Sequence, residues 1–204
     1  MASLFGRKSA LMRSLDFVAD SVVLTMLVVA SCIPFVTVGA ALSAAYEVAR
    51  GAHEGRGYMV RSFFRAFKRN FANATALWAV LAGAGLAIAA LWIYTSGLAA
   101  LTIKLAVTAL WLIMFIWVWP LQARFDNTVP VTLRNALLIG GTSIMATLLA
   151  AAVAGLWAML TVSCAVYLPQ GLFLLLVLGV GLIIMVQTPV FEWALRPYLR
   201  ASVE

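Results

Sequence analysis

Long apolar runs alternate with short polar segments along the whole chain, and this pattern predicts membrane-spanning helices. The runs are Phe17–Ile33, Phe35–Val48, Phe71–Ile93, Leu98–Leu121, Ala136–Leu160 and Gly171–Phe191. Several approach or exceed the roughly 20 residues that cross a bilayer as a helix, and three of the longest contain no charged residue. The sequence therefore predicts an all-α, polytopic membrane helical bundle of about six spans, organised as a single integral membrane domain over residues 1–204.

The second run, Phe35–Val48, is short for a full crossing and follows Pro34, which cannot donate the hydrogen bond that would continue the first helix. Two interpretations stay open: a thin second span, or a re-entrant arm that leaves five spans. Small residues recur four apart within it: Gly39 and Ser43, Ala40 and Ala44, Ala41 and Ala45. Because such pairs let helix backbones approach closely in lipid, we expect tight packing here rather than a substrate-lining surface.

Composition and charge agree with a membrane protein and add an orientation. The chain is 65% apolar, only 10% of its residues are charged, and the mean hydropathy is +1.05, which excludes an ordinary soluble domain. The net charge of +7 does not indicate nucleic-acid binding, because 13 of the 14 Lys and Arg residues fall in segments on one side of the predicted spans and only Lys104 falls on the other. The positive-inside rule places the basic side, and with it both termini, in the cytoplasm.

The segment before the third run predicts an amphipathic helix near residues 58–70. Apolar side chains recur at helical spacing at Val60, Phe63, Phe64, Phe67 and Phe71, with Arg61, Arg65 and Lys68 on the opposite face and Arg69 beside them. Such a helix can anchor in anionic headgroups or dock in a groove of a cytoplasmic partner, and the same pattern serves both. The predicted partner or lipid contacts are Arg61, Phe63, Phe64, Arg65, Phe67, Lys68 and Arg69.

Ionisable groups inside or beside the spans are candidates for a polar pathway or for structural ion pairs. They are Asp16, Asp20, Glu47, Gln187, Glu192 and Arg196, where Gln187 is included for its place one to two turns before Glu192. Each acid has a base at helical spacing on its own helix: Arg13 for Asp16, Arg50 for Glu47, and Arg196 and Arg200 for Glu192. We expect ion pairs that fix helix ends rather than a proton relay, and the last run is the candidate pathway if one exists.

Signatures of enzymes, metals and cofactors are missing. His53 is the one histidine and stands in the polar segment "GAHEGRG", where we expect it to be solvated, so neither a metal set nor a Ser-His-Asp triad can be assembled. No Walker-type glycine loop is present. We expect no enzyme activity, no metal and no cofactor, and any ATP-driven work would come from a partner.

Cysteines and tryptophans carry weaker signals. Cys32 and Cys164 both lie near the predicted outer face, and buried free thiols are favoured over a disulfide between them. Tryptophans near predicted span ends, at Trp92, Trp117, Trp119 and Trp193, are explained by an aromatic belt at the headgroups. A sugar-stacking surface formed by Trp111, Trp117 and Trp119 is the less favoured alternative.

Four blocks carry a family resemblance that covers nearly the whole chain in order. "IPFVTVGAALSAAY", "SFFRAFKRNFANAT", "WPLQARFDNT" and "PVFEWALRPYL" resemble the YesL family of bacterial integral membrane proteins. The resemblance implies a multi-pass protein of the bacterial plasma membrane with an accessory role in carbohydrate uptake, near subunits of a carbohydrate ABC transporter, and it supplies no catalytic residues. A permease subunit is excluded, because "AAYEVARGAHEG" lacks the order of the Glu-Ala-Ala coupling loop. A small independent transporter or channel is the alternative function.

Overall fold

The computed structural model describes residues 10–200, and within that range it contains helices and no strands. This confirms the predicted all-α class. The elements are α1 Ala10–Ser31, the 3-10 helix η1 Phe35–Thr37, α2 Val38–His53, α3 Met59–Tyr94, α4 Leu98–Arg124, α5 Val129–Thr142, α6 Ile144–Tyr167 and α7 Pro169–Arg200.

Five of these helices, α1, α3, α4, α6 and α7, are long and apolar enough to cross a membrane. The second predicted run is the exception, because its helix, α2, has 16 residues and is therefore about 24 Å long. α2 also starts and ends later than predicted, since Phe35–Thr37 forms the separate turn η1. The described helices thus fit a polytopic membrane bundle of five long spans and two shorter α-helices, α2 and α5.

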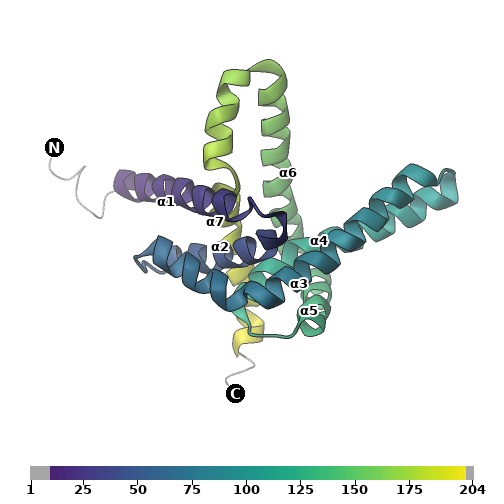
Figure 1. Ribbon diagram of the computed structural model, residues 1–204, viewed down its shortest axis with the longest axis horizontal. Coiled ribbons are helices and arrows are strands. Elements are labelled where there is room, and N and C mark those ends of the chain that lie inside the picture. The colour runs from purple at the N-terminus through teal and green to yellow at the C-terminus, as the bar shows by residue number, and fades with distance from the viewer. Residues whose placement is uncertain (1–9, 201–204) are drawn as a thin grey trace.

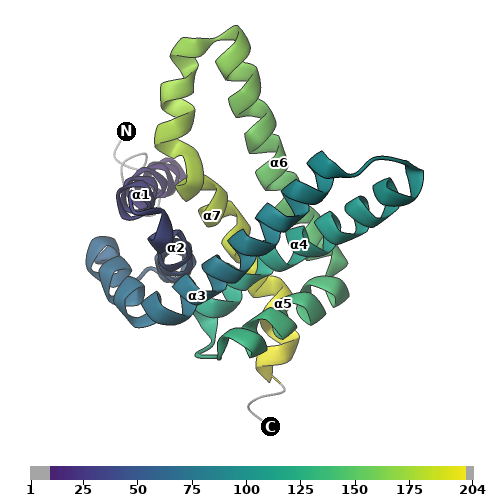
Figure 2. The ribbon, with the colours of Figure 1, turned by 45° about the vertical axis from the view of Figure 1, so that its right-hand side comes forward.

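The molecule has a packed region around α2 and two projecting hairpins. α2 lies between α1, α3, α4 and α7, and the start of α3 runs alongside it (Figure 1). The end of α3 and the start of α4 form one hairpin, and the end of α6 and the start of α7 form the other (Figures 1 and 2). The hairpin tips diverge, so each one packs mainly within itself while the packed region holds the core.

Close packing of α2 against α3 follows from the small residues of α2, as the sequence predicts. Gly39, Ala40, Ala41, Ser43, Ala44 and Ala45 are all buried. A Cβ atom placed on Gly39 would lie 2.2 Å from the carbonyl oxygen of Ala74 and 2.8 Å from the Cβ of Trp78, both on α3. Because backbone meets backbone here, only glycine fits at this crossing.

α3 joins the predicted amphipathic segment and the predicted third span into one continuous helix of 36 residues. It begins directly after Tyr58, whose φ of 65° breaks the chain direction, and no proline interrupts it before Tyr94. The segment near 58–70 is therefore a rigid extension of a span rather than a separately hinged helix.

The predicted run Ala136–Leu160 is not one helix, and this expectation was wrong. The chain bends at Ser143, so α5 ends at Thr142 and α6 begins at Ile144. Glycines at 140 and 141 weaken the helix, and the Thr142 hydroxyl donates to the carbonyl oxygens of Leu138 and Ile139. The Thr147 hydroxyl then donates 2.9 Å to the Gly140 carbonyl oxygen, which ties the two helices at the corner.

α7 is interrupted at Gly179, whose backbone leaves the helical region, and a side chain of α1 compensates. The Thr25 hydroxyl donates 2.8 Å to the Leu178 carbonyl oxygen and accepts 3.0 Å from the Gly181 N–H. A Cβ atom on Gly181 would lie 2.0 Å from the Ser21 carbonyl oxygen, so α1 and α7 touch backbone to backbone at the break. Broken backbone in a membrane helix is tolerated where neighbouring side chains satisfy it in this way.

Other predictions had mixed outcomes. Cys32 and Cys164 are free thiols as predicted, but both are only partly buried. The belt interpretation is wrong for Trp117 and Trp119, which are 0% and 2% exposed, and the Trp117 indole N–H donates to Thr147. Lys104 is also buried, with its ammonium group donating to the carbonyl oxygens of Trp92 and Thr95 at the end of α3. Its position away from the other basic residues therefore has a local cause, the favourable placement of a cation at a helix C-terminus.

Candidate functional site

The first part of α3 is held to the packed region by one edge only. Phe63 is fully buried against the core, and Ala66 and Asn70 are buried on the same side. Phe63 stacks with Phe67, which is half-buried. Phe63 was predicted as a partner or lipid contact, but its side chain belongs to the hydrophobic core instead.

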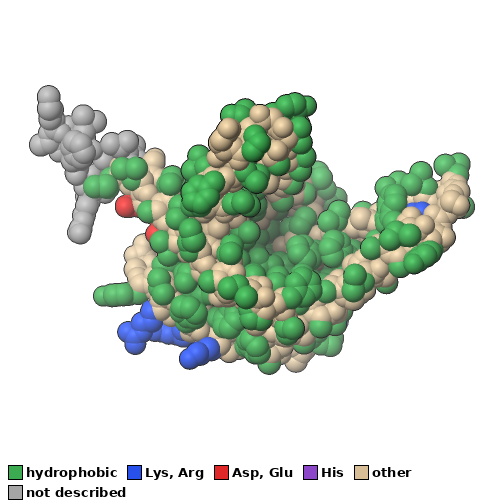
Figure 3. All heavy atoms as spheres, turned by 45° about the horizontal axis from the view of Figure 1, so that its top comes forward, with side chains coloured by type: hydrophobic (Ala, Val, Ile, Leu, Met, Phe, Trp, Pro, Cys, Tyr) green, Lys and Arg blue, Asp and Glu red, His purple; other side chains and the backbone are tan. Residues whose placement is uncertain are grey.

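The opposite edge of this segment is both apolar and cationic. Val60, Phe64 and Phe71 are 49%, 48% and 40% exposed. Arg61, Arg65 and Lys68 are exposed beside them and make no ion pair with any described residue. Figure 3 shows Lys and Arg side chains gathered at this edge of the molecule. We call the exposed surface of these six residues, Val60, Arg61, Phe64, Arg65, Lys68 and Phe71, the α3 basic-aromatic face.

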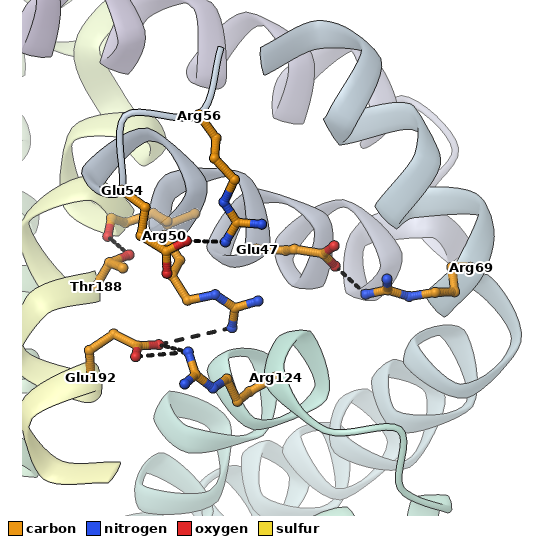
Figure 4. Close-up of polar contacts among 9 residues, drawn as sticks. Glu47, Arg50, Glu54, Arg56, Arg69, Arg124, Thr188 and Glu192 are labelled. Carbon is orange, nitrogen blue, oxygen red and sulfur yellow. Dashed lines mark hydrogen bonds and ion pairs between the residues drawn. The ribbon is translucent and has the colours of Figure 1, made fainter. Parts of the chain in front are cut away.

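Arg69, the fourth predicted cation of this segment, forms an ion pair. Its guanidinium donates 2.5 Å to a carboxylate oxygen of Glu47 on α2 (Figure 4). The Asn70 amide approaches the same oxygen at 3.5 Å. Glu47 therefore pairs across the α2–α3 contact and not with Arg50 on its own helix. The pair locks the base of the α3 basic-aromatic face to α2.

Glu192 joins three helices. Its two carboxylate oxygens accept from Arg124 of α4 at 3.0 and 2.9 Å, and one of them lies 3.9 Å from the guanidinium of Arg50 on α2 (Figure 4). Burial lowers the pKa of Arg50, the Arg124 guanidinium lowers it further, and Glu192 offsets part of this. Two cations sharing one carboxylate leave the cluster with an excess positive charge. A single Arg124 nitrogen, Nη1, donates to both carboxylate oxygens, and these charge-assisted hydrogen bonds link α4 to α7.

The remaining predicted ionisable residues are not brought into this cluster. Arg196 is exposed and forms no ion pair with Glu192, although it stands four residues away on α7. Asp16 is exposed and Asp20 is partly buried on α1, and neither has an ion pair with a described side chain. The side chains of Arg13 and Arg200, the predicted partners on the same helices, lie outside the described residues, as do Arg7 and Lys8.

The polar atoms of Gln187 form hydrogen bonds inside the packed region. Its carbonyl oxygen accepts 2.6 Å from the Tyr46 hydroxyl of α2, and its amide nitrogen donates 2.8 Å to the Ala150 carbonyl oxygen of α6. Thr188 donates to Ile184 within α7. With Glu192 paired as well, the polar residues of α7 form a seam of contacts to α2, α4 and α6.

His53 is exposed, as expected, and it also has a structural partner that the sequence does not indicate. Pro189 has no N–H, so the Met185 carbonyl oxygen four residues earlier in α7 loses its helical donor. The Nε2 atom of His53, the last residue of α2, lies 2.9 Å from that oxygen. Since a carbonyl oxygen only accepts, His53 carries the proton on Nε2 and replaces the backbone donor that Pro189 lacks.

One contact of the site has a signal in the sequence, and another has none. Arg124 and Arg50 both flank predicted spans on the same side as Glu192, and this shared depth was a usable signal for their contact. The Tyr46 partner of Gln187 is 141 residues away and no local pattern indicates it. Among the described residues, no group of three or more His, Cys, Asp or Glu side chains is placed to hold a metal ion.

Residues 21–90 match the model of a family described as "Protein of unknown function, DUF624". The matched part runs from α1 through α2 into α3, so it contains the tight α2–α3 crossing, the Glu47–Arg69 pair and the α3 basic-aromatic face. No curated protein and no solved structure matches the chain. Over this part the chain is similar to a family of unknown function.

Proposed function

We propose that this protein is an integral membrane accessory protein that docks a partner through the α3 basic-aromatic face. One observation carries the proposal: Phe63 and the Glu47–Arg69 pair fix the segment rigidly, while Arg61, Arg65 and Lys68 beside it have no ion pair with a described residue. Exposed aromatic and cationic groups on a preordered helix are what a partner with an acidic, apolar groove recognises, because little conformational entropy remains to be lost on binding.

The partner class comes from family resemblance. The resemblance to the YesL family favours the bacterial plasma membrane and subunits of a carbohydrate ABC transporter, while the family whose model matches residues 21–90 is described only as of unknown function. The distribution of Lys and Arg favours a cytoplasmic position for the α3 basic-aromatic face and both termini. The proposed role is support of carbohydrate uptake without catalysis by this chain.

The test compares two variants that lose the same charge. Arg61→Gln, Arg65→Gln and Lys68→Gln together remove the cations of the α3 basic-aromatic face, while Arg56→Gln, Arg134→Gln and Arg196→Gln remove three exposed cations elsewhere. Tagged proteins purified from native membranes in mild detergent are compared by quantitative mass spectrometry. Transporter subunits should co-purify with the wild type and the second variant and fall at least fivefold with the first. Equal recovery with both variants, or no recovered partner with the wild type, contradicts docking through this face.

An independent transporter or channel is the second candidate, and the break in α7 favours it. Discontinuous helices in transporters place backbone groups at substrate or ion sites, and α7 is interrupted at Gly179 with Gln187 and Glu192 further along. Purified protein in vesicles would then carry a flux that Glu192→Gln or Glu47→Gln reduces. Absence of flux from vesicles with correctly folded protein would remove this candidate.

A further inference from the structure

A polar cleft of about 510 Å³ lies where α5 bends into α6, beside the last turns of α7. Its lining residues are Thr142, Ser143, Ile144, Met145 and Ala146 at the bend and Trp193, Ala194, Arg196 and Pro197 on α7. The hydroxyl groups of Thr142 and Tyr198 lie 3.0 Å apart, which ties the end of α5 to α7 next to the cleft. No residue of the α3 basic-aromatic face lines the cleft, so the two sites are separate.

The charge of this cleft is positive and uncompensated. Of the described residues that line it, only Arg196 is charged. The Arg196 side chain is exposed and has no ion pair with a described residue. Glu192, four residues earlier on α7, is bound to Arg124 instead. A reachable guanidinium in a cleft without a carboxylate suits a phosphate group, whose oxygens accept its charge-assisted hydrogen bonds.

The bend supplies uncharged donors to the same cleft. The Thr147 N–H donates to the Ser143 carbonyl oxygen and makes the first backbone bond of α6. The N–H groups of residues 144–146 therefore precede the helical bonds, and the Ser143 side chain does not cap them. A phosphate held by Arg196 on the α7 side thus meets hydrogen-bond donors on the α6 side.

An apolar groove of about 330 Å³ between α6 and α7 adjoins the cleft. Its lining residues are Met145, Leu149, Pro189, Val190 and Trp193. Met145 and Trp193 also line the cleft, so the two hollows meet at these side chains. Pro189 lies about 10.5 Å along α7 from Arg196, and Leu149 lies about 6 Å along α6 from Met145. The groove therefore leads from the cleft toward the middle of the two helices.

The position of the two hollows relative to the membrane identifies their occupant. α6 and α7 are both candidate spans, and Leu149 in the groove is 46% exposed, so the groove opens to hydrocarbon. Arg196 stands near the end of α7, where arginines lie at headgroup level. Trp193, 56% exposed between them, belongs to the residue types that gather at this boundary. A phospholipid has the required form, because its phosphate and its acyl chains meet at the same depth.

We propose that the cleft and the groove together bind one membrane phospholipid, with its phosphate at Arg196 and one acyl chain against Leu149, Pro189 and Val190. Anionic phosphatidylglycerol suits the site best, because no acid among the lining residues balances the ammonium group of a zwitterionic headgroup. The bound lipid holds the α5–α6 bend against α7. Lipid binding is independent of partner docking by α3, so loss of one leaves the other intact.

The test titrates delipidated full-length protein with three probes and counts bound molecules by native mass spectrometry. Phosphatidylglycerol carries both parts of the ligand, diacylglycerol with the same chains lacks the phosphate, and glycerol 3-phosphate lacks the chains. Arg196→Gln removes the cation of the cleft, and Arg134→Gln removes an exposed cation outside it as the control. Leu149→Trp fills the groove, whereas Leu148→Trp puts the same ring on the neighbouring exposed residue, which does not line the groove.

The wild type, Arg134→Gln and Leu148→Trp should bind one phosphatidylglycerol with equal affinity. Arg196→Gln should weaken binding by about tenfold through loss of a charge-assisted hydrogen bond. Leu149→Trp should weaken it by roughly tenfold, because the acyl chain loses its apolar contact. The wild type should bind diacylglycerol about tenfold more weakly than phosphatidylglycerol. Thermal unfolding checks that each variant is folded.

Two results with the wild type alone overturn the proposal. Equal binding of diacylglycerol and phosphatidylglycerol shows that the phosphate is not recognised. Binding of glycerol 3-phosphate as tight as that of phosphatidylglycerol assigns the cleft to a soluble phosphate and leaves the groove without a role. Equal affinity of folded Arg196→Gln and wild type for phosphatidylglycerol overturns the proposal as well.

Discussion

The packed region around α2 and the two projecting hairpins are built from similar residues but have different neighbours. α2 and α6 both carry small residues at spacings of four, and in α2 they are buried against α3, whereas in α6 they line an open crevice. In the packed region polar groups cross between helices, as with Glu192, Gln187 and His53. In the hairpins they serve local backbone, as Lys104 does. Small residues therefore permit close contact without showing whether protein or lipid makes it.

The largest effect is expected from Gly39→Ala in the packed region. The added Cβ would lie 2.2 Å from the Ala74 carbonyl oxygen, so α2 and α3 must separate along their whole crossing. We expect the free energy of unfolding, measured in mixed detergent micelles, to fall by about 3 kcal/mol. A loss below about 0.5 kcal/mol would show that the two helices are not in backbone contact.

Breaking the Glu192 cluster should have the next largest effect. Glu192→Gln leaves Arg124 and Arg50 facing each other without a shared carboxylate, and because these side chains are 23% and 17% exposed, solvent screens only part of the repulsion. The expected loss of unfolding free energy is roughly 1 to 2 kcal/mol. Glu54→Gln, which breaks the exposed Glu54–Arg56 pair, is the control and should change it by less than about 0.5 kcal/mol. If both variants lowered the unfolding free energy equally, the partly buried Glu192 cluster would contribute no more to stability than the exposed Glu54–Arg56 pair.

His53→Ala tests the contribution of a single hydrogen bond to the stability of the packed region. It leaves the Met185 carbonyl oxygen, already deprived of a donor by Pro189, without a partner, and should lower the unfolding free energy by about 1 kcal/mol. His53→Gln keeps an N–H donor and should recover part of that loss. Identical values for the wild type and His53→Ala would indicate that water satisfies this carbonyl oxygen equally well.

The smallest effect is expected from Gly155→Ala in the α6 hairpin. Its Cβ enters open space, and alanine has the higher helix propensity, so unfolding free energy should stay unchanged or rise by up to about 1 kcal/mol. The same substitution at Gly39 is the counterpart in the packed region, which makes the two variants a direct pair. Destabilisation of Gly155→Ala by more than about 1 kcal/mol would mean that another helix occupies the crevice.

Span positions and the close packing of α2 were predictable, because apolar length and small-residue spacing are local properties of the sequence. The run Gly140, Gly141, Thr142 and Ser143 carries a signal for the bend at Ser143. It lies within a long apolar stretch, so the whole stretch was predicted as one span. The partners of Glu192 were not predictable from helical spacing. Arg124 is 68 residues away, and membrane helices choose such partners through tertiary packing. For the same reason the α3 phenylalanines were assigned to one environment, although Phe63 is fully buried and Phe64 is 48% exposed.

Photocrosslinking within the α3 segment tests partner docking most directly. A photoreactive phenylalanine analogue is placed at Phe64, which is 48% exposed on the α3 basic-aromatic face, or at the adjacent Phe63, which is fully buried against the core. After irradiation of native membranes, the account predicts a discrete protein adduct from position 64, weakened when Arg61, Arg65 and Lys68 are changed to Gln, and none from position 63. Lipid adducts alone at position 64 would contradict docking and leave this face as a membrane anchor.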